Sequence, residues 1–132
     1  MNGYLLDTNV ALLSLARPEK ISAAARAAIE QGPNLLSAIS YWEVVLKSTR
    51  EKLDVGEPRV WWADALRQLA ATPLPLRPDH VDRLGQLAKL ATLHADPFDR
   101  ILIAQALEED LNLVSAHAAL NAYAGTGLRV VW

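Results

Sequence analysis

The sequence predicts an α/β protein with a mostly parallel central sheet. Short apolar runs that end in turn residues alternate with longer runs of helical periodicity along the whole chain. Strands that are connected through helices pair in parallel, because each helix returns the chain to the starting edge of the sheet. The 132 residues are 52% hydrophobic, so we expect one domain over residues 1–132 with a substantial core.

The N-terminal part of the chain predicts a strand and two helices. Residues 4–6 (YLL) form a short buried strand that ends at Asp7 and Thr8. The apolar run 10–16 predicts a helix that stops near the next proline, since proline cannot continue a helix. The alanine-rich helix that follows has Ser22 as its N-cap and a glycine just beyond its C-terminus.

The central part of the chain predicts a strand, two helices and another strand. Residues 35–38 form the second strand, and a helix begins at Ser40 in SYWEVVLKSTREKL. Gly56 and Pro58 break the chain before VWWADALRQLAA, whose apolar residues recur on one helical face. Residues 74–76, enclosed by prolines, predict a short strand at or near a sheet edge, because proline cannot donate a ladder hydrogen bond.

The C-terminal part of the chain predicts two helices and two strands. PDHVDRLGQLAKLA is helical in pattern, and PFDRILIAQALEED has the clearest helical pattern in the chain. NLVSA predicts a buried strand, HAALNAY a helical turn and LRVVW a final strand. This order completes the alternation of strands and helices from one end of the chain to the other.

The composition excludes several classes of protein. The formal net charge of −2 is not that of a strongly basic nucleic-acid binder, so any RNA contact needs a local cationic patch. Without cysteine the chain has neither disulfides nor thiolate metal ligands, which fits a cytoplasmic protein. The N-terminal apolar run contains Asp7 and lacks a preceding basic region, which excludes a signal peptide. No stretch reaches the ~18 apolar residues of a membrane helix.

Acidic residues follow the expected strands at comparable positions. Asp7 comes directly after the first strand, whereas Glu43 and Asp99 are expected in the first turns of two helices. Ser115 and His117 follow the strand NLVSA. Ligands bind beyond the carboxyl ends of strands in open α/β sheets, so we expect these side chains to gather at one rim. Clustered carboxylates repel one another unless a cation lies between them, and oxygen-only ligands suit Mg²⁺ or Mn²⁺.

Several of these residues also have a purely structural interpretation. Asp7 stands where a turn or N-cap residue is expected. Ser40 and Glu43 form the pattern S-x-x-E of a capping box, in which the glutamate turns back toward the serine amide. Asp96 precedes Pro97, a residue favoured at the first helical position, so Asp96 is expected to cap the helix. Asp99 lies at the third helical position, where capping explains it less well, so chemistry is expected of Asp99 and not of Asp96.

Three other polar residues are assigned to ordinary surface roles. Lys47 lies four residues after Glu43, the spacing of an ion pair along one helix face. Together with Arg50 and Lys52 it is also a candidate for a modest patch that faces RNA, although a solvated helix face is the default expectation. His80 stands between two aspartates near a helix start and is expected to be solvated, and His94 is expected in a surface loop.

Four segments, LLDTNVALL, SYWEVVLKS, HADPFDRILIAQA and LVSAHAALNAY…VVW, occur in the order found in PIN-domain proteins. The chain most resembles the VapC-type toxins of bacterial toxin–antitoxin pairs, over essentially its whole length. The resemblance implies a three-layer α/β/α fold and a Mg²⁺- or Mn²⁺-dependent endoribonuclease. It also implies a homodimer that is neutralised by a cognate VapB-like antitoxin, with structured RNA such as tRNA or rRNA as the substrate class.

The resemblance also carries over residue by residue. Asp7, Glu43 and Asp99 match the family's metal-binding acids, Asp96 matches a second aspartate that assists or caps, and three polar residues match supporting positions: Thr8, Asn9 and Ser115. His117 departs from the family pattern, because it stands where an aspartate is often found. An imidazole can bind a metal or hold a water, but it does not replace a negative charge. The number of metal ions in the site, one or two, therefore stays open.

Three functions are consistent with these observations. The first is a metal-dependent ribonuclease toxin, and the second is a catalytically weak PIN-like module that binds RNA or a partner. A phosphoacceptor domain ranks lowest, because no clear lysine follows a late strand. The apolar helices around residues 10–16 and 60–69 are candidates for grooves that bind an antitoxin or a second copy, although core packing accounts for most of their positions.

Overall fold

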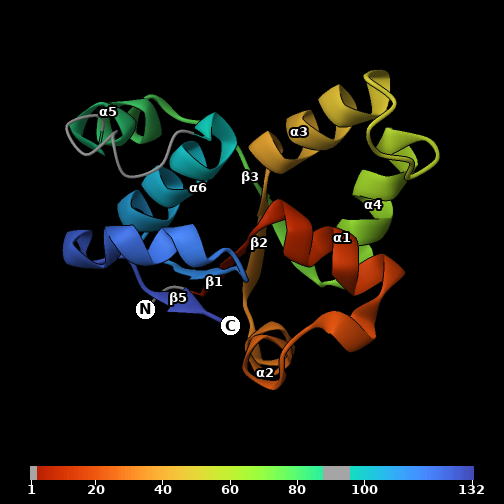
Figure 1. Cartoon of the computed structure of the whole chain (residues 1–132), viewed down its shortest axis with the longest axis horizontal. Helices are drawn as coiled ribbons and strands as arrows, with labels where there is room; N and C mark the ends of the chain where they lie inside the picture. The colour runs from red at the N-terminus through yellow and green to blue at the C-terminus, as the bar shows by residue number, and fades with distance from the viewer. Residues whose placement is uncertain (1–2, 88–95) are drawn as a thin grey trace.

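The computed structural model describes residues 3–87 and 96–132, in which helices lie on both sides of a central sheet (Figure 1). The elements in chain order are β1 (Tyr4–Leu6), α1 (Thr8–Ala16), η1 (Pro18–Lys20), α2 (Ala23–Gln31), β2 (Asn34–Ser37), α3 (Ala38–Thr49), α4 (Pro58–Gln68), β3 (Ala71–Leu74), α5 (Pro78–Leu87), α6 (Pro97–Glu108), β4 (Asn112–Val114), η3 (Ala118–Thr126) and β5 (Val130–Val131). This arrangement confirms the predicted α/β fold of three layers. None of the described helices is long and apolar enough to cross a membrane.

The sheet has five strands in the order β3-β2-β1-β4-β5, and all four neighbouring pairs are parallel. The prediction of a mostly parallel sheet is therefore confirmed. The strand expected at residues 74–76 does lie at an edge, but it spans Ala71–Leu74 and includes Pro73. Pro73 has no backbone N–H to donate, which an edge strand tolerates because one of its sides has no partner strand.

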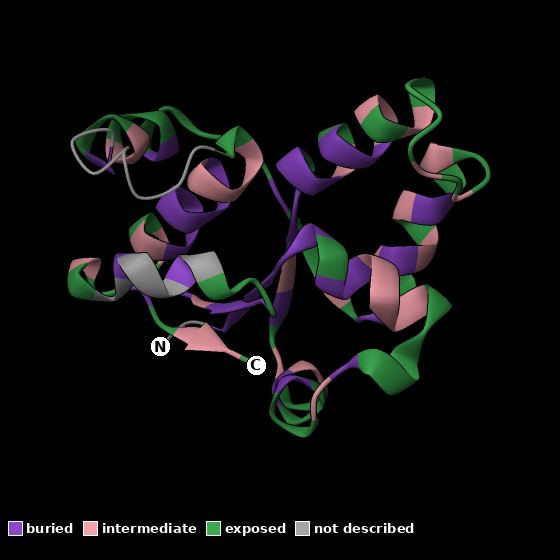
Figure 2. Ribbon diagram, in the orientation of Figure 1, coloured by how far each residue is buried: buried purple, intermediate pink, exposed green. Residues whose placement is uncertain are grey.

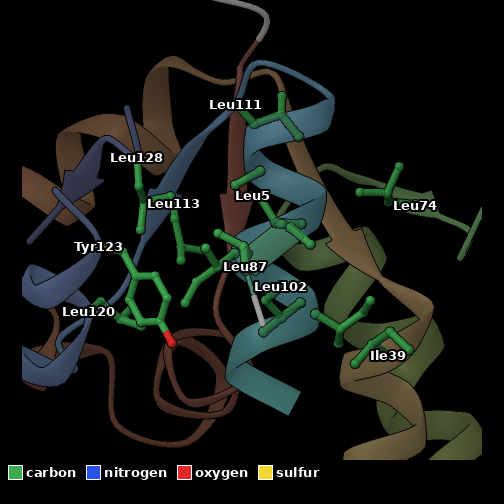
Figure 3. Packing of buried hydrophobic residues seen from close by; sticks show 14 residues of the cluster. Leu5, Ile39, Leu74, Leu87, Leu102, Leu111, Leu113, Leu120, Tyr123 and Leu128 are labelled. Atoms are coloured by element: carbon green, nitrogen blue, oxygen red, sulfur yellow. The ribbon is translucent and has the colours of Figure 1, made fainter. Parts of the chain in front are cut away.

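Alternate residues of the strands bury their side chains in two separate cores. Leu5 and Leu113 face one core, formed with α5, α6 and η3, whose packed leucines and Tyr123 are seen in Figure 3. Leu6 and Val114 face the other, formed with α1, α2 and α4. Figure 2 shows buried residues on the sheet and on the helix faces that cover it. The near-continuous apolar strands follow from this burial on both faces.

Helix α3 starts earlier than predicted, and the capping-box interpretation of Ser40 and Glu43 is wrong. Strand β2 runs directly into α3, so that Ser37 is the N-cap and its hydroxyl accepts the backbone N–H of Ile39 at 3.0 Å. Ser40 lies inside the helix, buried, where its hydroxyl accepts a 2.8 Å hydrogen bond from Thr8. Glu43 is consequently in the second turn, not the first, and its carboxylate does not cap the helix.

His80 is fully buried, which contradicts the prediction that it is solvated. Its Nδ1 accepts the backbone N–H of Arg77 at 3.0 Å, which leaves the proton on Nε2 to be donated to Glu109 at 3.0 Å. Gln105 of α6 also lies 3.3 Å from Nδ1 and accepts the Ser37 hydroxyl at 2.6 Å. The packing of α5 against α6 encloses this imidazole. His94 lies outside the described residues.

Candidate active site

The candidate site lies where the order of the strands reverses. From β1 the sheet grows through β2 to β3 on one side and through β4 to β5 on the other. The carboxyl ends of β1 and β4 therefore frame the place where open α/β sheets bind ligands. Asp7 follows β1 and Ser115 follows β4, and the Ser115 hydroxyl donates a 2.6 Å hydrogen bond to Oδ2 of Asp7.

A pocket of about 330 Å³ opens at this point and brings the predicted acids together. Its lining residues are Asp7, Thr8, Asn9, Glu43, Lys47, Asp96, Asp99, Ala116 and His117. Ser115 stands behind the pocket wall, buried against Asp7. Of the predicted polar residues, Thr8 is buried and bonded to α3 through Ser40, whereas Asn9 is exposed at the rim.

Asp7 is a buried carboxylate whose side chain is not used for capping. It holds the N-cap position of α1, but its carboxylate makes no capping hydrogen bond and accepts the Ser115 hydroxyl instead. Burial raises the pKa of Asp7 above its usual 3.8, and the nearby carboxylates of Asp99 and Glu43 raise this pKa further, against the opposing effect of the Ser115 hydrogen bond. A cation in the pocket would relieve this unfavourable charge.

Glu43 is buried, and its Oε2 lies 2.8 Å from the ammonium group of Lys47, which confirms the predicted ion pair. The hydrogen bond to Glu43 raises the pKa of Lys47, and the charges of Asp96 and Asp99 add to that rise. Lys47 also lines the pocket. The available signal was its i,i+4 spacing from Glu43, which puts both side chains on one helix face.

The two aspartates of the DPFD segment have different roles. Asp96 is the N-cap of α6, where its Oδ1 accepts the backbone N–H groups of Phe98 at 2.9 Å and Asp99 at 3.4 Å. The predicted cap is therefore confirmed. Asp99, in the first turn, instead points its carboxylate toward His117, whose Nδ1 donates to Oδ2 at 2.8 Å. The backbone N–H of His117 is held in turn by the Ser115 hydroxyl at 3.1 Å.

The donors around the pocket fit a hard divalent cation. They are carboxylate oxygens at one strand-end cluster, with one imidazole at the rim. Each acid already has an internal partner: Asp7 has Ser115, Glu43 has Lys47, and Asp99 has His117. Among the described residues, no three acidic or histidine side chains converge tightly enough to form a complete metal site.

Comparison with models of protein families matches residues 4–125 to the PIN domain. The chain belongs to the PIN-domain family. This PIN domain is 30% identical to the ribonuclease VapC22 of Mycobacterium tuberculosis (strain ATCC 25618 / H37Rv), over an alignment of 141 residues that covers 100% of both proteins. The predicted family is therefore confirmed on the whole chain.

Solved structures share the fold of this PIN domain at low sequence identity. The DNA-bound VapBC complex from Salmonella typhimurium matches with a TM-score of 0.69 and 18% identity, over 98% of this chain and 97% of that one. VapBC2 from Rickettsia felis, bound to a promoter DNA fragment, matches with a TM-score of 0.72 and 14% identity, over 96% of each chain. At these identities the likeness establishes the fold.

Proposed function

We propose that this PIN domain is a VapC-type toxin, a metal-dependent endoribonuclease that cleaves RNA phosphodiester bonds. The observation that carries the proposal is the pocket at the sheet's reversal point, whose lining includes Asp7, Glu43 and Asp99. The similarity to a ribonuclease over the full length of the chain supports it.

In this proposal, the carboxylates of Asp7, Glu43 and Asp99 hold Mg²⁺ or Mn²⁺. When bound there, the ion would supply an activated water and would neutralise charge that develops on the scissile phosphate. Ser115 holds the Asp7 carboxylate toward the pocket through its 2.6 Å hydrogen bond. The bond of 2.8 Å between Thr8 and Ser40 ties the start of α1 to α3, and so fixes the helix that carries Glu43.

The remaining polar residues assist at the edge of the pocket. Asp96 caps α6 and thereby sets the position of Asp99 one turn later. His117 orients the Asp99 carboxylate through the 2.8 Å hydrogen bond and is near enough to hold a water or a phosphate oxygen. Asn9, exposed at the rim, is available to contact the RNA backbone.

The partners follow from the same family. We propose tRNA or rRNA as the substrate class, a homodimer as the assembly, the cytoplasm as the compartment and a VapB-like antitoxin as the inhibitor. Solved structures with this fold are VapBC complexes, which supports the antitoxin. An apolar groove of about 440 Å³ between α1 and the start of α4 is a suitable surface for it, and its lining includes Leu12, Leu15, Val55 and Trp61.

The test is a cleavage assay with purified protein and total bacterial RNA, with Mg²⁺, with Mn²⁺, and with excess chelator. We expect discrete RNA fragments in the presence of either ion and none with chelator. The variants Asp7→Ala and Asp99→Ala should be inactive under the same conditions. Cleavage that persists in the chelator, or in both variants, would overturn the proposal.

The second candidate is a PIN-like module that acts by binding RNA or a partner. His117 favours it, because the family often has an aspartate at this position and an imidazole brings one negative charge fewer. This candidate predicts metal-stimulated RNA binding without cleavage, and cleavage that appears only after His117→Asp. Robust cleavage by the wild-type protein would exclude it.

A further inference from the structure

Lys47 is the lysine that lines the acidic pocket in the described part of the chain. Its ammonium group lies 2.8 Å from Oε2 of Glu43, and the two side chains differ greatly in exposure, at 46% for Lys47 and 9% for Glu43. The carboxylate therefore lies within the wall of the pocket, whereas the ammonium group reaches it from the solvent side. A long side chain held at one end in this way can leave its partner without any movement of α3.

The charge around Lys47 is strongly unbalanced. The pocket lining contains four carboxylates, those of Asp7, Glu43, Asp96 and Asp99, and Lys47 is the one lysine or arginine among those described lining residues. Lys47 thus neutralises part of the pocket and not one carboxylate alone.

We propose that Lys47 competes with the divalent cation for Glu43, and that its displaced ammonium group then binds a phosphate of the RNA. The inference rests on the proposed function, because it assumes that a cation and RNA meet at this pocket. It adds a positioning residue that couples metal binding to RNA binding.

The competition follows from the contacts. A cation bound to the Glu43 carboxylate would lie a few ångströms from the Lys47 ammonium group, and the two positive charges repel each other. An ion pair with an exposed partner contributes little free energy, so its loss costs about five-fold or less in affinity. The displaced ammonium group remains at the pocket rim, where an RNA phosphate at the site would be within its reach. Lysine binds such phosphates as a point charge.

The first experiment measures the affinity for Mn²⁺ from the electron paramagnetic resonance signal of the free ion at pH 7.5. Lys47→Met should bind Mn²⁺ about three- to five-fold more tightly than the wild type, the range that an exposed ion pair allows. Lys47→Arg should stay near the wild type. The matched control is Lys52→Met, which removes the same charge from an exposed lysine five residues later, outside this pocket, and should leave the affinity unchanged.

Two results of this experiment separate the inference from the proposed function. Unchanged or weaker Mn²⁺ binding in a folded Lys47→Met variant would overturn the inference, because Lys47 would then order Glu43 for the metal. Absence of Mn²⁺ binding to the wild type would overturn the proposed function, and the inference with it.

The second experiment measures binding of a fluorescein-labelled, 20-nucleotide, single-stranded RNA of mixed sequence by fluorescence anisotropy over a range of salt concentrations. Ca²⁺, also a hard oxygen-binding cation, replaces the catalytic ion. With Ca²⁺, Lys47→Met should reduce the slope of log Kd against log salt by about 0.7, the value of one phosphate contact on a single strand. Without Ca²⁺, wild type and variant should share one slope, because Lys47 then contacts Glu43. The proposed coupling of metal binding to RNA binding would be overturned if Lys47→Met reduced this slope equally with and without Ca²⁺, or did not reduce it with Ca²⁺.

Discussion

Ser115 donates a 2.6 Å hydrogen bond to the carboxylate of Asp7, although the two residues are 108 positions apart in the chain. The bond crosses from the end of β4 to the end of β1 at the point where the strand order reverses. It explains why Asp7, at the N-cap position of α1, does not cap that helix with its side chain. The carboxylate is kept for the pocket, in a buried position that is unfavourable for its charge.

This unfavourable charge predicts that Asp7→Asn stabilises the metal-free protein at neutral pH. Burial, together with the carboxylates of Asp99 and Glu43, raises the pKa of Asp7 in the folded chain above its usual 3.8. The folded state thus holds the Asp7 proton more tightly than the unfolded state, and stability falls as the pH rises from 3.8 through the raised pKa. Removing the charge should raise Tm at pH 7 by a few degrees, as ~1 kcal/mol shifts Tm by about 4 °C.

Thermal unfolding of the wild type and Asp7→Asn between pH 3 and pH 8, in chelator, checks this prediction. The difference in Tm should vanish below pH 3.8, where the wild-type carboxyl is protonated in both states. Addition of Mg²⁺ should stabilise the wild type and leave the variant unchanged. A lower Tm for the variant at pH 7 would contradict the account, because the hydrogen bond to Ser115 would then outweigh the cost of burial.

The division of roles between Asp96 and Asp99 predicts that their alanine variants affect different quantities, stability in one case and RNA cleavage in the other. Asp96→Ala removes the cap of α6 and should cost about 1 kcal/mol of unfolding free energy. Asp99→Ala should change stability little but lower RNA cleavage more than about 100-fold, beyond the effect typical of residues that only support a metal ligand. Urea unfolding and cleavage rates measure the two quantities separately.

The control for this pair is Asp96→Ser, which retains a capping oxygen and should restore the stability. If Asp96→Ala and Asp96→Ser both abolished cleavage at unchanged stability, Asp96 would be a metal ligand and not a cap.

The position of His117 predicts that a carboxylate there strengthens metal binding. His117→Asp puts a charge beside Asp99, whose present partner is the His117 imidazole at 2.8 Å. We expect the affinity for Mg²⁺ to rise about five-fold or more, because a unit charge ~4 Å away contributes about 1 kcal/mol even in bulk water. Isothermal titration calorimetry measures both the affinity and the number of ions. Weaker binding in His117→Asp would show that the imidazole itself is a ligand.

The buried hydrogen bonds of His80 predict a large loss of stability in His80→Leu. This change leaves the backbone N–H of Arg77 and the side chain of Gln105 without their shared acceptor. Gln105 keeps its 3.4 Å hydrogen bond to the Pro75 carbonyl, so the loss falls on the backbone N–H of Arg77 and on the Glu109 carboxylate, which loses its donor. An unsatisfied polar group costs ~1–3 kcal/mol when it is buried, so the unfolding free energy should fall by roughly 1–3 kcal/mol. Chemical denaturation measures this fall, and metal affinity at the pocket, whose lining does not include His80, should stay within two-fold, roughly, of the wild type. A loss below ~0.5 kcal/mol would contradict the structural role.

The features that were predicted correctly depend on local patterns. The alternation of apolar strands and helices was sufficient to predict a parallel sheet, and the placement of Asp7 after a strand put it at the sheet rim. Asp96 followed by Pro97 was sufficient to predict a helix start, because both residues act on their nearest backbone neighbours.

The features that were missed depend on contacts between distant segments. Ser37 and Ser40 both suit an N-cap, and the choice between them depends on where β2 stops pairing with its neighbours. His80 is buried because α6 packs over it, which the polar residues beside it in the sequence conceal. Lys47 contributes to the pocket because the fold brings Asp96 and Asp99 of α6 to the same pocket as Lys47 of α3, which the spacing from Glu43 alone does not reveal.

The most direct test of the central claim is a crystal of the protein soaked in Mn²⁺, with the ion located by its anomalous scattering. The account predicts a peak in the pocket at the ends of β1 and β4, within coordination distance of carboxylate oxygens of Asp7, Glu43 and Asp99. The Lys47 ammonium group should then be turned away from Glu43. A peak bound elsewhere, or an empty pocket at Mn²⁺ concentrations that support RNA cleavage, would contradict it.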